Sequence, residues 1–106
     1  MVSKERRKAR RFLLRLPLTV RWKAGLLVRE AATETRDVSS CGVYFHLPVE
    51  LQHGCAVEIA MTLPKELTQG RSIQVRCDGW VVRSEPEESG NMGVVAVVER
   101  YELLRV

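Results

Sequence analysis

The stretch DVSSCG, at residues Asp37–Gly42, lies between two segments that both have the composition of strands, and the rest of the chain is arranged around it. Asp and Ser side chains hydrogen-bond to backbone N–H groups ahead of them, and Gly takes a positive φ without steric cost. We therefore expect a tight turn between two strands, in which Gly42 can take a positive φ. A polar turn ending in Gly is most often only a connector, so this stretch alone does not predict a binding site.

The second feature is a basic segment at the start of the chain, where residues 6–11 read RRKARR. The chain carries a formal charge of +4 and has a pI near 9.3, and the excess lies largely in residues 4–23. This distribution favours an anionic partner. Because residues 2–11 carry almost no large apolar side chains, we expect residues 1–13 to form a flexible arm outside the core.

Six short segments have strand patterns, and no long helical pattern separates them. In the first of them, Leu14 to Trp22 alternate between apolar and polar residues, which is typical of a half-buried strand. Pro17 places this strand at an edge or a bulge, and Gly79 marks a bulge or close packing. The expected strands are residues 14–22, 26–38, 42–47, 57–63, 72–84 and 92–98.

This pattern predicts an all-β fold, a six-stranded antiparallel barrel or sandwich, formed by residues 14–106 as one domain. Barrel closure would leave no exposed strand edge. Residues 99–105 are expected to form a short C-terminal helix of one or two turns, or a tail.

Several classes of protein are disfavoured by the sequence. No apolar run approaches the roughly 20 residues that span a bilayer, and no signal peptide is recognisable, so we expect a cytoplasmic protein. The three cysteines are widely spaced and fit reduced thiols. His46, His53 and Cys55 do not supply the ligand set of a metal site. We find no nucleophile and base in a catalytic pattern, so we expect neither an enzyme nor a cofactor.

Taken together, the two motifs resemble those of the PilZ domain family. That family has an Arg-x-x-x-Arg segment just before the first strand and an Asp/Asn-x-Ser-x-x-Gly segment between the second and third strands. Here Arg7 and Arg11 match the first motif, and Asp37–Gly42 matches the second. Arg6 and Arg10 also fit the first motif, but the spacing to Leu16-Pro17-Leu18 favours Arg7 and Arg11. The resemblance covers nearly the whole chain and implies a six-stranded barrel that binds cyclic di-GMP.

The residue types suit this ligand, which carries two phosphodiester charges and two guanines. The planar fork of an arginine binds phosphate or the guanine O6/N7 edge with two hydrogen bonds. A carboxylate at Asp37 suits the guanine donor edge, Ser39 both donates and accepts, and Gly42 admits a close backbone. The expected cyclic di-GMP-binding residues are Arg6, Arg7, Arg11, Asp37, Ser39 and Gly42.

Two further residues are candidate ligand contacts. Arg10 lies within the basic segment. Trp80 alternates with the apolar positions of its strand, so its side chain should point outward unless a bulge at Gly79 turns it inward. We expect the ligand to order the basic arm, creating a surface for a downstream protein that the sequence does not identify.

Two alternatives remain open. One is a PilZ-type adaptor without nucleotide binding, although both motifs are intact. The other is a small barrel that binds single-stranded nucleic acid, which is disfavoured because the basic residues cluster in one arm. A homodimer is also compatible with the sequence.

Overall fold

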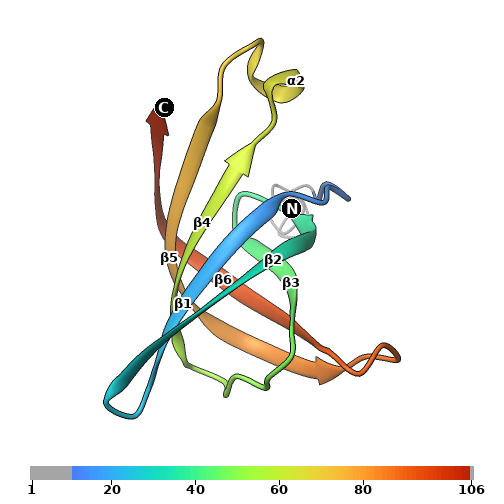
Figure 1. Cartoon of the computed structure of the whole chain (residues 1–106), viewed down its shortest axis with the longest axis vertical. Coiled ribbons are helices and arrows are strands. Elements are labelled where there is room, and N and C mark those ends of the chain that lie inside the picture. The colour runs from blue at the N-terminus through green and yellow to red at the C-terminus, as the bar shows by residue number, and fades with distance from the viewer. Residues whose placement is uncertain (1–10, 106) are drawn as a thin grey trace, which may run out of the picture.

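The structure is a computed structural model that describes residues 11–105, and it confirms an all-β fold with a closed barrel. The barrel consists of β1 (Pro17–Ala24), β2 (Leu27–Val38), β3 (Gly42–Leu47), β4 (Ala56–Leu63), β5 (Ile73–Pro86) and β6 (Met92–Arg105). The order around it is β1-β2-β3-β6-β5-β4, and every neighbouring pair is antiparallel. The first three strands form a meander, and β6 returns to pair with β3 (Figure 1).

Alternating side chains fill the interior of the barrel. In β1, Leu18, Val20 and Trp22 point inward and are buried, while their neighbours in the sequence lie on the outer side. The other strands contribute in the same way, with Phe45 and Val81 fully buried. Burial of each large apolar side chain stabilises the fold by about 1.5–3 kcal/mol. This core holds the six strands together as one barrel.

The first strand begins later than its alternation predicts. Pro17 is its first residue, a position where the missing backbone N–H is tolerated. Leu16 is still buried in the core, and Leu14 packs against the core from outside the strand. The inward parity expected for this segment is therefore confirmed, but the hydrogen-bonded ladder is shorter than the segment.

The expectation of a C-terminal helix is wrong. Residues 99–105 continue β6, which stays paired with β5 as far as Arg105 opposite Ile73. Because β5 is 14 residues long, it offers a hydrogen-bonding partner along the whole of this segment. The one helix of the described chain is instead a single turn, α2 (Lys65–Thr68), which follows Pro64 and joins β4 to β5.

Gly79 lies very close to the backbone of β6, and such close packing is one of the two reasons expected for a glycine within this strand. A Cβ at this residue would lie 1.8 Å from the backbone oxygen of Val97. The register also shifts here, because Glu99 is an extra residue of β6 opposite the step from Asp78 to Gly79. The bulge thus lies in β6 and leaves the alternation of β5 intact as far as Val81.

No helix of residues 11–105 is long and apolar enough to cross a membrane.

Candidate functional site

The site is built around an ion pair between the two sequence motifs. Arg11 donates a hydrogen bond from Nη1 to Oδ1 of Asp37 over 2.6 Å. The Asp37 side chain is 7% exposed, whereas that of Arg11 is 60% exposed. A nearly buried carboxylate thus holds one N–H group of a guanidinium that is otherwise largely exposed to solvent.

The backbone brings Arg11 to this place. Phe12 forms an isolated bridge with Val38, donating to its carbonyl over 2.8 Å and accepting from its N–H over 3.0 Å. Arg11 immediately precedes this bridge, and Asp37 immediately precedes Val38. Two backbone hydrogen bonds therefore set the approach of the two charged side chains.

A buried threonine strengthens the same attachment. The Thr35 hydroxyl accepts a hydrogen bond from the N–H of Leu16 over 2.8 Å and donates one to the carbonyl of Leu14. Thr35 is 1% exposed, and its own N–H donates to the Leu16 carbonyl over 2.9 Å. One side chain of β2 thus fixes the segment that leads from Arg11 to the start of β1.

The predicted turn is present, and Ser39 closes it from within. Its Oγ accepts hydrogen bonds from the N–H groups of Cys41 and Gly42, each over 3.1 Å. The Ser39 N–H donates to the carbonyl of Gly42 over 2.9 Å. These bonds give the turn a fixed shape and orient its backbone.

Gly42 does not use the positive φ that a glycine can take. The glycines with positive φ in the described chain are residues 25, 54, 70 and 90. Gly42 is instead needed because a Cβ would lie 2.9 Å from the backbone oxygen of Ala96 on β6. The motif glycine therefore allows the start of β3 to lie close against β6.

Arg36 is a further arginine at the site that the sequence motifs do not include. It is the extra residue where the β2–β3 register shifts between Thr35 and Asp37. Its guanidinium carbon lies 4.5 Å from the centre of the Tyr44 ring, and its Nε lies 3.9 Å from Oδ2 of Asp37. Its position directly before the motif was the available signal, but the bulge that aims it was not visible in the sequence.

Trp80 faces outward, which is the first of the two orientations considered for it, and not inward. It is 38% exposed, while the next residue, Val81, is fully buried. Val97 of β6 pairs with Gly42 on one side and with Trp80 on the other. Two strand spacings, about 10 Å, therefore separate the backbones of Gly42 and Trp80. The indole lies on the same outer side of the barrel as the turn.

The remaining candidate residues, Arg6, Arg7 and Arg10, lie outside the described residues. Arg11 lies within the described residues and contacts Asp37, and the register of the arginine motif stays a prediction. The histidine excluded as a metal ligand has a different partner: His46 Nδ1 lies 2.8 Å from Glu87 Oε1. Within residues 11–105 no group of three His, Cys, Asp or Glu residues could hold a metal ion.

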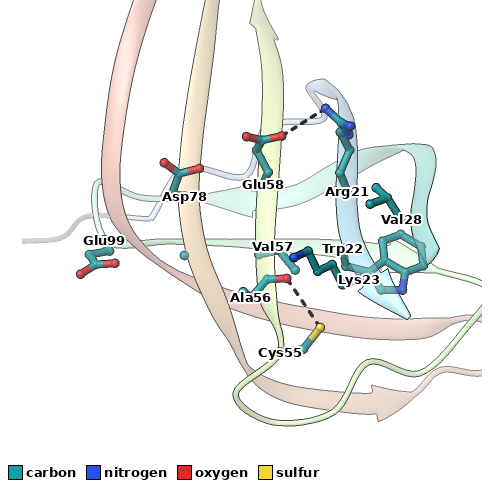
Figure 2. Close-up of a pocket in the computed structure, with 11 residues that line it drawn as sticks. Arg21, Trp22, Lys23, Val28, Cys55, Ala56, Val57, Glu58, Asp78 and Glu99 are labelled. Carbon is teal, nitrogen blue, oxygen red and sulfur yellow. Dashed lines mark hydrogen bonds and ion pairs between the residues drawn. The ribbon is translucent and has the colours of Figure 1, made fainter. Parts of the chain in front are cut away.

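A separate hollow of the described barrel lies away from the two motifs. It measures about 680 Å³ and is lined by Trp22 and Lys23 of β1 and by residues of β4, β5 and β6 (Figure 2). Three carboxylates, those of Glu58, Asp78 and Glu99, line it together with the cations of Arg21 and Lys23, and Arg21 is paired with Glu58. The hollow therefore has a mixed charge and contains no residue of either motif, so the motif residues are the better candidates for an anionic ligand.

Comparisons with known proteins agree with this architecture. The solved structure of the Bacillus subtilis inhibitor of motility (MotI/DgrA) is similar to it, with a TM-score of 0.75 and 17% sequence identity. The match covers 91% of this chain and 44% of that chain, so the present chain spans less than half of that protein's structure. A search of curated protein sequences found no match.

A sequence profile shows the family. The profile of the PilZ domain matches residues 5–102, which include both motifs and five complete strands. The chain therefore belongs to the PilZ domain family.

Proposed function

We propose that this chain is a non-catalytic receptor that binds cyclic di-GMP on the outer side of the barrel, beside the Asp37–Gly42 turn. PilZ domains are of the cyclic di-GMP-receptor type, and the family match is the basis for the ligand. The observation that carries the proposal is the ion pair of Arg11 and Asp37, which joins the two motifs at one place.

In this proposal Asp37 acts first on Arg11. Its nearly buried carboxylate fixes the guanidinium and leaves the other N–H donors directed to solvent. An arginine held in this way can bind a phosphate or the O6/N7 edge of a guanine with little further ordering cost. The lone pairs of Asp37 that Arg11 does not use remain available as acceptors for guanine N–H groups.

Arg36 and Trp80 provide additional ligand contacts on the same side. Arg36 adds a second described cation beside Asp37 and lies over the Tyr44 ring. The exposed indole of Trp80 offers an apolar face to a base, because base–aromatic stacking tolerates any base. Guanine specificity would therefore come from the arginines and Asp37 and not from the indole.

Signal transmission would use the segment that precedes Arg11. Residues 1–10 carry Arg6, Arg7 and Arg10, whose guanidinium groups would bind the phosphates of the bound ligand. Fixing this arm against the barrel would create a composite surface of arm, ligand and turn. A downstream protein would read that surface.

The first test is isothermal titration of the chain with cyclic di-GMP, GTP, cyclic di-AMP and a short single-stranded oligonucleotide at two salt concentrations. Saturable binding of cyclic di-GMP alone supports the receptor. Absence of binding with every nucleotide would favour a protein-interaction adaptor. Binding of the oligonucleotide that weakens steeply with salt would favour a nucleic-acid-binding barrel.

The second test uses variants of the site. Arg11→Ala removes at least one charge-assisted hydrogen bond, which is worth about 1.5–3 kcal/mol, so affinity should fall at least about tenfold. The matched control is Arg21→Ala, because Arg21 is an exposed arginine of β1 paired with Glu30 and Glu58. Equal losses in the two variants would show that total charge, and not the motif, determines binding.

A further inference from the structure

The last strand of the barrel has two halves with different surroundings. Met92–Val97 lies between β3 and β5 and pairs with both. Beyond it, the N–H of Val98 donates to the Cys41 carbonyl over 2.8 Å, and residues 99–105 pair with β5 alone among the described strands. In Figure 1 this part of β6 stands at the side of the molecule, next to the label of the C-terminus. Residues 99–105, which we call the β6 edge, thus present backbone donors and acceptors that another strand can pair with.

The β6 edge also exposes large apolar side chains. Tyr101 is 58% exposed and Leu103 is 60% exposed, and Leu104 on the opposite side of the strand is 38% exposed. Tyr101 and Leu103 lie opposite Cys77 and Val75, so they share the inward side of the sheet at the open end of the barrel. An edge with both free backbone groups and apolar side chains is suited to strand addition.

The charges on this edge indicate the partner. Arg100 and Glu102 flank Tyr101, and both are exposed. When such a strand pairs antiparallel with a second copy about a two-fold axis at Tyr101, each Arg100 lies directly opposite the other copy's Glu102. Opposite charges in directly facing positions stabilise strand pairs, and like charges destabilise them. We propose that the β6 edge joins two copies of this chain in a symmetric antiparallel dimer centred on Tyr101.

Other registers of the same pairing are less favourable. An axis at Glu102 places this carboxylate opposite itself, and an axis at Arg100 does the same for the guanidinium. An axis at Leu103 leaves both charges without an opposite partner. An axis midway between two residues would pair inward side chains of one copy with outward side chains of the other, because side chains alternate with period two. Of these registers, the one at Tyr101 alone pairs both charges with their opposites.

The neighbouring strand extends this charge pattern. On β5, Asp78 lies opposite Arg100, and Arg76 lies opposite Glu102. Across the proposed dimer, one row of side chains would therefore read Asp78 and Arg100 from one copy, then Glu102 and Arg76 from the other. Negative and positive charges alternate along this row, and the two-fold axis repeats it in reverse. The surface is complementary to itself, which favours a second copy over an unrelated strand.

The first experiment measures the mass of the full chain in solution by sedimentation velocity over a range of concentrations, without nucleotide. The native chain should form a dimer as the concentration rises. Arg100→Glu and Glu102→Arg should each weaken the dimer at least about tenfold, because the axis repeats each unfavourable contact twice. The double exchange Arg100→Glu/Glu102→Arg should restore it when Asp78→Arg/Arg76→Glu is added, because these changes keep opposite charges across β5 and β6. A native chain that stays monomeric, or a dimer that the single exchanges leave intact, would overturn the proposal.

The second experiment tests the register by oxidation to a disulfide in a Cys41→Ser/Cys55→Ser/Cys77→Ala background, because Cys77 lies opposite Tyr101 on β5 and would compete for the new thiol. Tyr101→Cys would place two thiols on the axis at a Cα separation of about 4.5–5.5 Å, within the range of a disulfide. Leu103→Cys is the matched control, because this residue would face Glu99 of the other copy. A covalent dimer of the first variant alone supports the register, whereas cross-linking of the second alone, or of neither, contradicts it.

Discussion

The Thr35 hydroxyl group supplies two of the hydrogen bonds that attach residues 11–16 to the barrel, and its removal should be costly. Thr35→Val keeps the shape of the side chain but removes its bonds to the Leu16 N–H and the Leu14 carbonyl. Leu16 is 3% exposed, so its N–H would be left without a partner in a buried place, at about 1–3 kcal/mol. Loss of the bond to the half-buried Leu14 carbonyl adds about 0.5–1 kcal/mol. We expect the free energy of unfolding to fall by about 2–4 kcal/mol.

Thermal and urea unfolding followed by circular dichroism would measure this loss. For a domain of this size, the melting temperature should fall by about 10 °C or more. Thr33→Val is the matched control, because Thr33 lies two residues earlier on the same side of β2 and faces Leu18. It should change stability by less than about 0.5 kcal/mol. Equal effects of the two substitutions would refute the role assigned to the Thr35 hydroxyl.

Three other perturbations test particular contacts. Gly79→Ala should abolish cooperative unfolding or lower stability by about 3 kcal/mol or more in a denaturant titration, since its Cβ would overlap the Val97 carbonyl oxygen. Burial raises the pKa of Cys77 from 9.0 to about 11; the folded state holds this proton more tightly, so stability should fall between pH 9 and pH 11, and less so in Cys77→Ala. Arg36→Ala removes a cation placed over the Tyr44 ring and should lower stability by less than about 1 kcal/mol in urea unfolding.

Alternating segments could be predicted because their information is local. The inward parity of Leu18, Val20 and Trp22 follows from the period of two in a strand with one buried side. The same rule predicts that Trp80 points outward, provided that β5 has no bulge before this residue. These positions are confirmed by burial in the barrel.

The end of β6 could not be predicted in the same way. Glu99 is an extra residue in the ladder, so the alternation breaks there, and the adjacent Leu103 and Leu104 match no strand period. Its strand conformation depends on pairing with β5, which begins at Ile73, far away in the sequence. Such non-local pairing carries no signal within residues 99–105.

The site was predictable in its parts and not in its arrangement. The motifs marked Arg11 and Asp37, which the structure brings together. The contributions of Thr35 and Arg36 depend on a cross-strand attachment and on a bulge, which only the register reveals. Gly42 was singled out by the motif, but its close packing against Ala96 of β6, which requires a glycine without a positive φ, depends on the strand pairing.

The central claim is that cyclic di-GMP binds beside the turn that joins β2 to β3. Its most direct test is a titration of the ¹⁵N-labelled chain with cyclic di-GMP, followed by amide chemical shifts. The largest saturable changes should occur at Arg11, at Asp37–Gly42 and at the Trp80 indole. Shifts confined to the hollow around Trp22, or no shift at a ligand concentration well above that of the protein, would contradict the account.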